Sequence, residues 1–167
     1  MSHGLINARA VKPISALFTI SHSTGTISRA TPNTTFSVAA METGSTNAAA
    51  NYTISNGRVY LNEGFYYAEL YIGTATSSIA ASQFQIWLRK NGTTQLGEKG
   101  WVGNYMGDAS SIYYISGCSS QGLQVSFYAK DGDYIDIAWA WPNSYNGSLT
   151  YDAGASTRSR LFLQKWK

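Results

Sequence analysis

A chain of 167 residues is long enough to form one domain with a substantial buried core. Its 12 basic and 9 acidic residues are spread along the chain and give a net charge of +3, which excludes the dense basic surface of a nucleic-acid-binding protein. The single cysteine, Cys118, excludes an internal disulfide, and no run of about 18 apolar residues exists for membrane insertion.

The first 13 residues, MSHGLINARAVKP, form a segment of their own. They have neither the basic head nor the apolar run of a signal peptide, so we expect synthesis in the cytoplasm. We interpret residues 1–13 as an N-terminal arm that precedes a single domain over residues 14–167. The arm's apolar and basic side chains are candidates for attachment to another protein: Leu5, Ile6, Arg9, Val11 and Lys12.

Alternation of apolar and polar residues dominates the rest of the chain and predicts eight to ten short β-strands. The strongest runs cover 64–73, 84–90, 111–116, 123–129, 134–141 and 160–166, and weaker runs cover 16–20, 34–39, 52–55 and 58–61. Four dipeptides that tolerate positive φ mark turns: Asn56-Gly57, Asn91-Gly92, Asp131-Gly132 and Asn146-Gly147. Residues 38–51 contain helix-forming residues but lack an apolar face, so we expect a loop there.

The stretch YAKDGDYIDIAW, residues 128–139, holds three carboxylates close together: Asp131, Asp133 and Asp136. If the flanking strands form a hairpin, a three-residue loop ending at Gly132 pairs apolar with apolar residues across it. The pairs are Phe127 with Ile135, Val125 with Ile137, and Leu123 with Trp139. This register places Asp131 in the turn and Asp136 on the polar face opposite Ser126.

The spacing of these carboxylates does not fit a helix-flanked calcium loop, because Gly132 directly follows the first aspartate. We interpret the cluster as a structural corner. The alternatives are a metal site, or a catalytic pair completed by a distant Glu63, Glu69, Glu98, Asp108 or Asp152. The two histidines, His3 and His22, are too few for a three-histidine zinc site, and we expect no catalytic residue, metal or cofactor.

Two predicted strands carry large apolar residues on both faces. Strand 64–73 has Phe65, Tyr67 and Tyr71 on one side and Tyr66, Leu70 and Ile72 on the other. The last strand sets Leu161 and Leu163 against Phe162 and Trp166. In a two-layer sandwich one face of each sheet should be solvated, so this pattern indicates that a partner subunit covers it. The alternative is a scatter of surface tyrosines.

Four segments resemble, in this order, strands of the jelly roll shared by complement globular heads and tumour necrosis factor-like domains. They are GFYYAELYIG, IWLRKNGTTQ, LQVSFYAKDGDYIDIAW and SRLFLQKWK, and the resemblance covers residues 52–167. It implies an all-β, ten-strand jelly-roll sandwich that forms a homotrimer through the sheet holding its first, third, sixth and last strands. Candidate residues at the trimer interface are Phe65, Tyr67, Tyr71, Phe162 and Trp166.

The same domain occurs in bacteriophage virions, in capsid decoration proteins, head fibres and tail-fibre tips. A Gly/Ser/Thr/Asn-rich chain with no collagen stalk or membrane anchor resembles these more than animal signalling proteins. The leading hypothesis is therefore a non-enzymatic decoration (cement) protein on the virion surface, attached through its arm to the major capsid protein or another virion protein. The alternative is a fibre tip that binds a receptor or host glycan. Its candidate ligand-facing aromatics are Trp101, Tyr105, Tyr113, Tyr114 and Tyr145.

Overall fold

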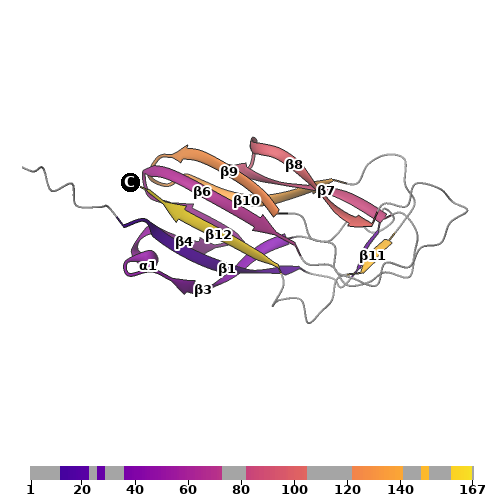
Figure 1. Ribbon diagram of the computed structural model, residues 1–167, viewed down its shortest axis with the longest axis horizontal. Coiled ribbons are helices and arrows are strands. Elements are labelled where there is room, and N and C mark those ends of the chain that lie inside the picture. The colour runs from indigo at the N-terminus through magenta and orange to yellow at the C-terminus, as the bar shows by residue number, and fades with distance from the viewer. Residues whose placement is uncertain are drawn as a thin grey trace, which may run out of the picture.

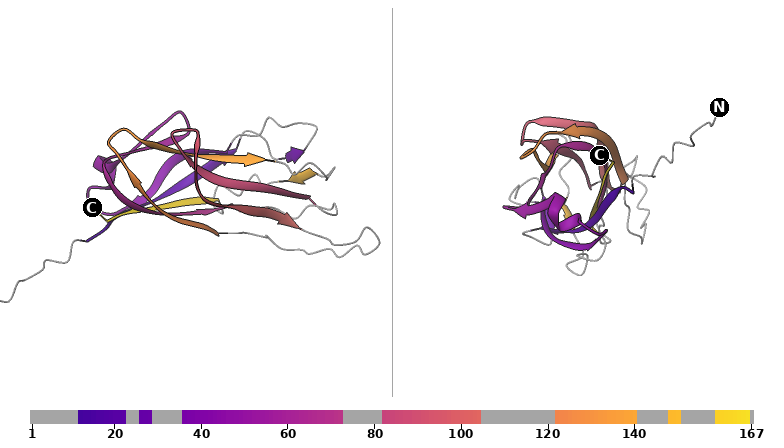
Figure 2. Two further views of the ribbon diagram at one scale, coloured as in Figure 1. Left: turned by 90° about the horizontal axis from the view of Figure 1, so that it is seen from above. Right: turned by 90° about the vertical axis from the view of Figure 1, so that its left-hand side faces the viewer.

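The computed structural model describes residues 12–22, 26–28, 36–72, 82–104, 122–140, 148–150 and 159–166. These residues form two five-stranded antiparallel sheets that pack face to face (Figures 1 and 2). Sheet I has the order β3 (Phe36–Gly44), β1 (Ile14–His22), β12 (Arg160–Lys165), β6 (Gly64–Tyr71), β9 (Gly122–Ala129). Sheet II has the order β4 (Tyr52–Ser55), β5 (Arg58–Leu61), β10 (Tyr134–Ala140), β7 (Ser82–Lys90), β8 (Thr94–Asn104). A short pair, β2 (Thr26–Ser28) with β11 (Ser148–Thr150), and a one-turn helix, α1 (Ala48–Asn51), complete these elements.

The chain crosses repeatedly between the two sheets, which is the connectivity of a jelly roll. From β5 in sheet II it passes to β6 in sheet I, returns to β7 and β8, and then crosses to β9, β10 and β12 in turn. The predicted fold class, an all-β jelly-roll sandwich, is confirmed. Asn56 and Asn91 have φ of 50° and 53°, and Gly57, Gly92 and Gly132 are also positive, as their turn dipeptides predicted.

Alternate side chains of the strands fill a core between the sheets. The largest fully buried side chains are Tyr66, Phe18, Ile20, Leu61, Leu70, Ile72, Ile86, Leu88 and Ile135. Burying each such apolar side chain stabilises the fold by about 1.5–3 kcal/mol. The one polar group among them, the Tyr66 hydroxyl, donates to the Asn62 carbonyl at 2.6 Å, and burial raises the pKa of Tyr66 to about 12.

The predicted hairpin between residues 123–129 and 134–141 is wrong. β9 pairs with β6 in sheet I, and β10 pairs with β5 and β7 in sheet II, so the turn at Asp131 carries the chain from one sheet to the other. Leu61 holds this crossing from β5, because its N–H donates to Asp133 O at 2.8 Å and its carbonyl accepts from Gly132 N at 3.0 Å. Asp136 consequently lies beside Arg89 of β7 and not opposite Ser126.

One further prediction needs correction, and some strands were missed. The segment 38–51, expected to be a loop, contains most of β3 and all of α1. β3 is an edge strand with few buried residues after Val38, so its pairing with β1 depends on the backbone and leaves little apolar pattern. β8 was not predicted at all, and neither were the short strands β2 and β11. The predicted strand 111–116 and the turn at Asn146-Gly147 lie outside the described residues.

Candidate functional site

The outer face of sheet I is the candidate site, and β6 supplies its centre. Along β6 the odd-numbered residues point away from the core: Phe65 is 62 % exposed and Tyr71 is 37 % exposed, whereas Tyr67 is half-buried. The even-numbered neighbours, such as Tyr66 and Leu70, are buried. This placement follows from the period-two geometry of a strand and agrees with the division of faces that the sequence predicts.

Neighbouring strands add aromatic rings to both sides of Phe65. On one side, Trp166 follows β12 and is 53 % exposed, and its N–H donates to the Phe65 carbonyl at 2.8 Å. On the other side, Tyr128 of β9 is the register partner of Phe65, and the two ring centroids are 5.0 Å apart. A hollow of about 420 Å³ lies among these three rings, Ser126 and Phe127.

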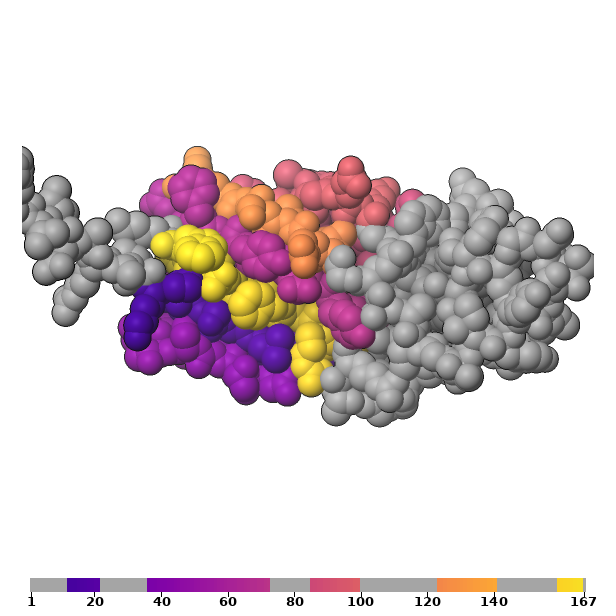
Figure 3. Space-filling model, in the orientation of Figure 1, coloured from indigo at the N-terminus to yellow at the C-terminus, as the bar shows by residue number. Residues whose placement is uncertain are grey.

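A second part of the same face continues toward β1. The rings of Tyr67 and Phe162 meet edge to face with centroids 6.4 Å apart, and Leu17 of β1 is the register partner of Phe162. Figure 3 shows this outer face, on which side chains of β9, β6, β12 and β1 lie next to one another. We call this surface the aromatic face; it consists of Leu17, Phe65, Tyr67, Tyr71, Tyr128, Phe162 and Trp166.

Polar groups on the aromatic face are paired within it. Arg160 of β12 forms an ion pair with Glu42 of β3 at 2.6 Å. Partial burial and the nearby Glu69 raise the pKa of Tyr67. Tyr128 donates a hydrogen bond to Glu63, and this bond raises the pKa of Tyr128. Both tyrosines are therefore neutral at physiological pH. Their hydrogen-bond partners, Glu63 and Glu69, place acidic groups beside the rings.

The acidic cluster at residues 131–136 is divided between separate structural partners. Asp131 accepts from the backbone N–H of Glu63 at 2.5 Å. Asp133 accepts from Asn91 Nδ2 at 2.8 Å and from the Lys130 N–H at 3.0 Å, and these bonds lower its pKa. Asp136 pairs with Arg89 in sheet II at 2.8 Å. The three side chains thus stabilise the crossing between the sheets and its surroundings.

The described part of the chain contains no group of three His, Cys, Asp or Glu side chains that could hold a metal ion. Glu63, one candidate for a second catalytic carboxylate, meets Asp131 through its backbone N–H and not through its carboxylate. Asp108 and Asp152 lie outside the described residues. No helix in the described ranges is long and apolar enough to cross a membrane.

The structure describes only some of the other predicted site residues. Lys12 is exposed just before β1, whereas the remaining arm candidates Leu5, Ile6, Arg9 and Val11 lie outside the described residues. Trp101 belongs to β8. The other candidate ligand-facing aromatics lie outside the described residues: Tyr105, Tyr113, Tyr114 and Tyr145. Tyr128 and Leu17 were missed as members of the aromatic face. The alternation of 123–129 places Tyr128 with Gln124 and Ser126, and that signal could have identified it.

No family model and no curated protein matches the chain. Solved structures do match it: the Eiger TNF from S. frugiperda has a TM-score of 0.55 at 15 % identity, over 92 % of this chain and 93 % of that one. Murine APRIL has a TM-score of 0.52 at 10 % identity, over 92 % and 99 % of the respective chains. The fold is a tumour necrosis factor-like jelly roll. At these identities the likeness concerns the fold alone.

Proposed function

We propose that the protein is a non-enzymatic structural protein that assembles into a homotrimer through the aromatic face. The observation that carries this proposal is the exposure of large rings on one sheet of the sandwich, with Phe65 and Trp166 more than half exposed. An exposed cluster of this kind marks an interaction surface. A threefold assembly is the arrangement that the resemblance to complement heads and tumour necrosis factor-like domains implies, and a jelly roll is compatible with it.

Cations already cover two aromatic rings of sheet II, which supports the choice of sheet I as the assembly surface. Arg58 lies over the Tyr134 ring at 4.5 Å from its centroid, and Lys99 lies over the Trp87 ring at 4.3 Å. Such pairs shield ring surface and keep a charge at the boundary with water. Sheet II is therefore suited to face solvent while sheet I faces neighbouring subunits.

We further propose that the trimer decorates a bacteriophage capsid and is attached by its N-terminal arm. Ile14, the first residue of β1, is the register partner of Lys165 near the end of the chain, so the arm leaves the sandwich at the end marked C in Figure 1. In a trimer with parallel subunits, the three arms would leave from one end. Three arms on one particle gain avidity, because the second and third contacts become intramolecular.

Removal of residues 2–12 tests the attachment role. The truncated protein should remain a folded trimer with the melting temperature of the full chain, because β1 begins after the arm, at Ile14. It should no longer sediment with virus particles, whereas a control with residues 2–12 in scrambled order should show whether composition alone is sufficient. Full retention of particle binding by the truncated protein would refute attachment through the arm.

A receptor- or glycan-binding fibre tip is the second candidate function, and one observation favours it: a polar pocket with an aromatic end between β3 of sheet I and β10 of sheet II. The two functions share the trimer but differ in location. Electron microscopy of assembled particles separates them, because a decoration protein lies over the capsid and a tip protein lies at the end of a fibre.

A further inference from the structure

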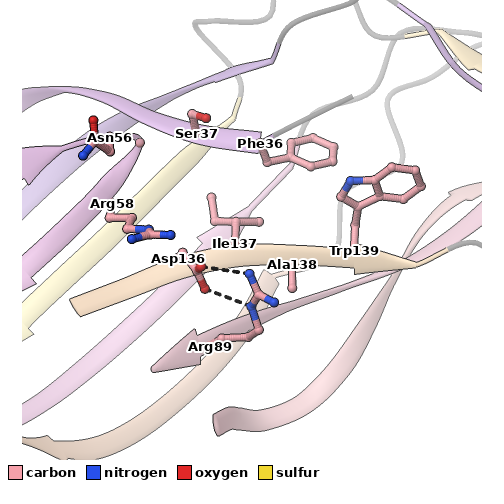
Figure 4. A pocket seen from close by; sticks show the side chains of 10 residues that line it. Phe36, Ser37, Asn56, Arg58, Arg89, Asp136, Ile137, Ala138 and Trp139 are labelled. Carbon is pink, nitrogen blue, oxygen red and sulfur yellow. Dashed lines mark hydrogen bonds and ion pairs between the residues drawn. The ribbon is translucent and has the colours of Figure 1, made fainter. Parts of the chain in front are cut away.

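A pocket of about 340 Å³ opens at the side of the sandwich, where β3 of sheet I approaches β10 of sheet II (Figure 4). Its polar lining comes from Ser37, Asn56, Arg58, Arg89 and Asp136, and Trp139 lies farther along β10. The volume is at the lower end of the range of about 300–1,000 Å³ found for small-molecule sites. The pocket is separate from the aromatic face, which belongs to the outer side of sheet I.

Local sequence builds this opening. β5 is short and pairs with β10 only at Tyr134 and Ile135, so its ladder ends before Asp136. The turn Asn56-Gly57 leads into β5, and its Gly57 carbonyl accepts a hydrogen bond from the Val38 N–H of β3 at 3.0 Å. This bond ties the turn to β3, and the pocket lies between these two segments and the remainder of β10.

The charged end of the pocket is preorganised. Arg89 donates to both carboxylate oxygens of Asp136, from Nε at 3.0 Å and from Nη2 at 2.8 Å, and Asp136 is only 8 % exposed. A carboxylate offers about four lone-pair positions, so two remain after this fork for hydroxyl donors. The fork fixes the carboxylate in one orientation before any ligand arrives.

Arg58 adds a second guanidinium to this end. The Arg58 guanidinium lies over the face of the Tyr134 ring. Among the described residues, no carboxylate pairs with its N–H donors. Two guanidinium groups and one carboxylate therefore line the pocket. The excess positive charge favours a ligand that carries one negative group.

The opposite end is aromatic. Figure 4 shows the rings of Phe36 and Trp139 at this end and Arg58, Asp136 and Arg89 toward the other. Trp139 is three residues beyond Asp136 on the same strand, which corresponds to about 10 Å. Side chains alternate along a strand, so Trp139 and Asp136 leave opposite faces of β10 and flank its edge beside the pocket. A ligand that lies along this edge can contact the indole with its apolar face and the polar end with its hydroxyl and anionic groups.

We propose that this pocket binds the terminal unit of an acidic carbohydrate, a sugar ring bearing a carboxylate. Arg58 binds the ligand carboxylate, Asp136 and Asn56 hydrogen-bond its hydroxyls, and Trp139 packs against the ring. Neither trimer formation nor capsid attachment is needed for this binding. The pocket is formed by one subunit, and none of its lining residues belongs to the aromatic face.

Titration of the ¹⁵N-labelled protein with D-glucuronate and D-glucose tests the proposal, because the two sugars differ only in a carboxylate that replaces a hydroxymethyl group. Glucuronate should shift the indole N–H signal of Trp139, assigned with the Trp139→Phe variant, and glucose should bind about tenfold more weakly or not at all. Inorganic phosphate serves as a probe of charge alone. A phosphate response as strong as the glucuronate response would overturn recognition of the sugar.

Two matched variants locate the ligand carboxylate. Arg58→Gln and Lys99→Gln each remove one cation that lies over an aromatic ring of sheet II, but only Arg58 lines the pocket. Arg58→Gln should weaken glucuronate binding about tenfold or more, and Lys99→Gln should leave it unchanged, with both variants folded by circular dichroism. Absence of any glucuronate response in the wild type, or an equal response in the Arg58→Gln variant, would overturn the proposal.

Discussion

Replacing Phe65 by serine removes the most exposed ring of the aromatic face. An aromatic side chain covers about 150–250 Å² when it is buried. With 62 % of Phe65 exposed in the single subunit, about 120 Å² remains for a neighbouring subunit to cover. At about 25 cal/mol per Å² this area corresponds to about 3 kcal/mol per subunit, or about a hundredfold in affinity for each contact. The protomer itself should lose only the contact of the Phe65 ring with Tyr128, about 0.5–1.5 kcal/mol, because most of the ring is solvated before assembly.

Sedimentation velocity over a concentration series measures this effect. Phe65→Ser should shift the trimer–monomer midpoint to a much higher concentration, while the urea midpoint of the monomer changes little. Tyr60→Ser is the control, since Tyr60 lies on sheet II and packs against Tyr134 with centroids 5.4 Å apart. That control should lower the stability of the protomer and leave the assembly midpoint unchanged. If Phe65→Ser assembles as tightly as the wild type, Phe65 does not lie in a subunit interface.

Two further predictions concern the turns. Gly57→Ala should lower the free energy of unfolding by more than the roughly 1 kcal/mol expected for positive φ, because its Cβ would lie 2.7 Å from Ser37 Oγ. Gly132→Ala is the control, because a Cβ at Gly132 would have nothing within 4 Å and the variant would show the cost of positive φ alone. Urea melts of both variants measure the two losses. Equal losses would show that Ser37 moves without cost. The hydrogen bond from Asn91 lowers the pKa of Asp133, so its stabilisation is present above about pH 4 and is lost as the pH falls through the folded-state value. Asp133→Asn should therefore flatten the acid side of the plot of melting temperature against pH, and an unchanged slope would contradict this.

Alternation in the sequence correctly predicted which side chains of β6 face outward. A shift of one residue moves every side chain of a strand to the other face, so a strand such as 64–71 is sharply specified once its pattern is read. Phe65, Tyr67 and Tyr71 were separated from Tyr66 and Leu70 on this basis, and their burial agrees with it. The same rule would have added Tyr128, whose ring contacts Phe65.

The alternating pattern could not predict which strands pair with one another. β9 and β10 lie in different sheets, yet both direct apolar residues into the same core, so Phe127 and Ile135 match in polarity whether or not they are paired. Polarity matching therefore could not distinguish a hairpin from a crossing. The sheet that each strand joins depends on distant partners, such as Leu61 at the crossing.

Glycine concealed β8, the longest of the three strands that were not predicted. β8 contains Gly97, Gly100 and Gly103, which interrupt the alternating pattern, and Gly97 has φ of 68° near a register shift against β7.

The pocket could not be predicted from the sequence either. It depends on where β5 ends relative to β10, and Arg58 and Asp136 are far apart in the sequence.

The mass of the wild-type protein in solution tests trimer formation, on which the proposed function depends, most directly. Light scattering at micromolar concentration should give three times the chain mass of 18.2 kDa. A mass of one chain, 18.2 kDa, would contradict the account.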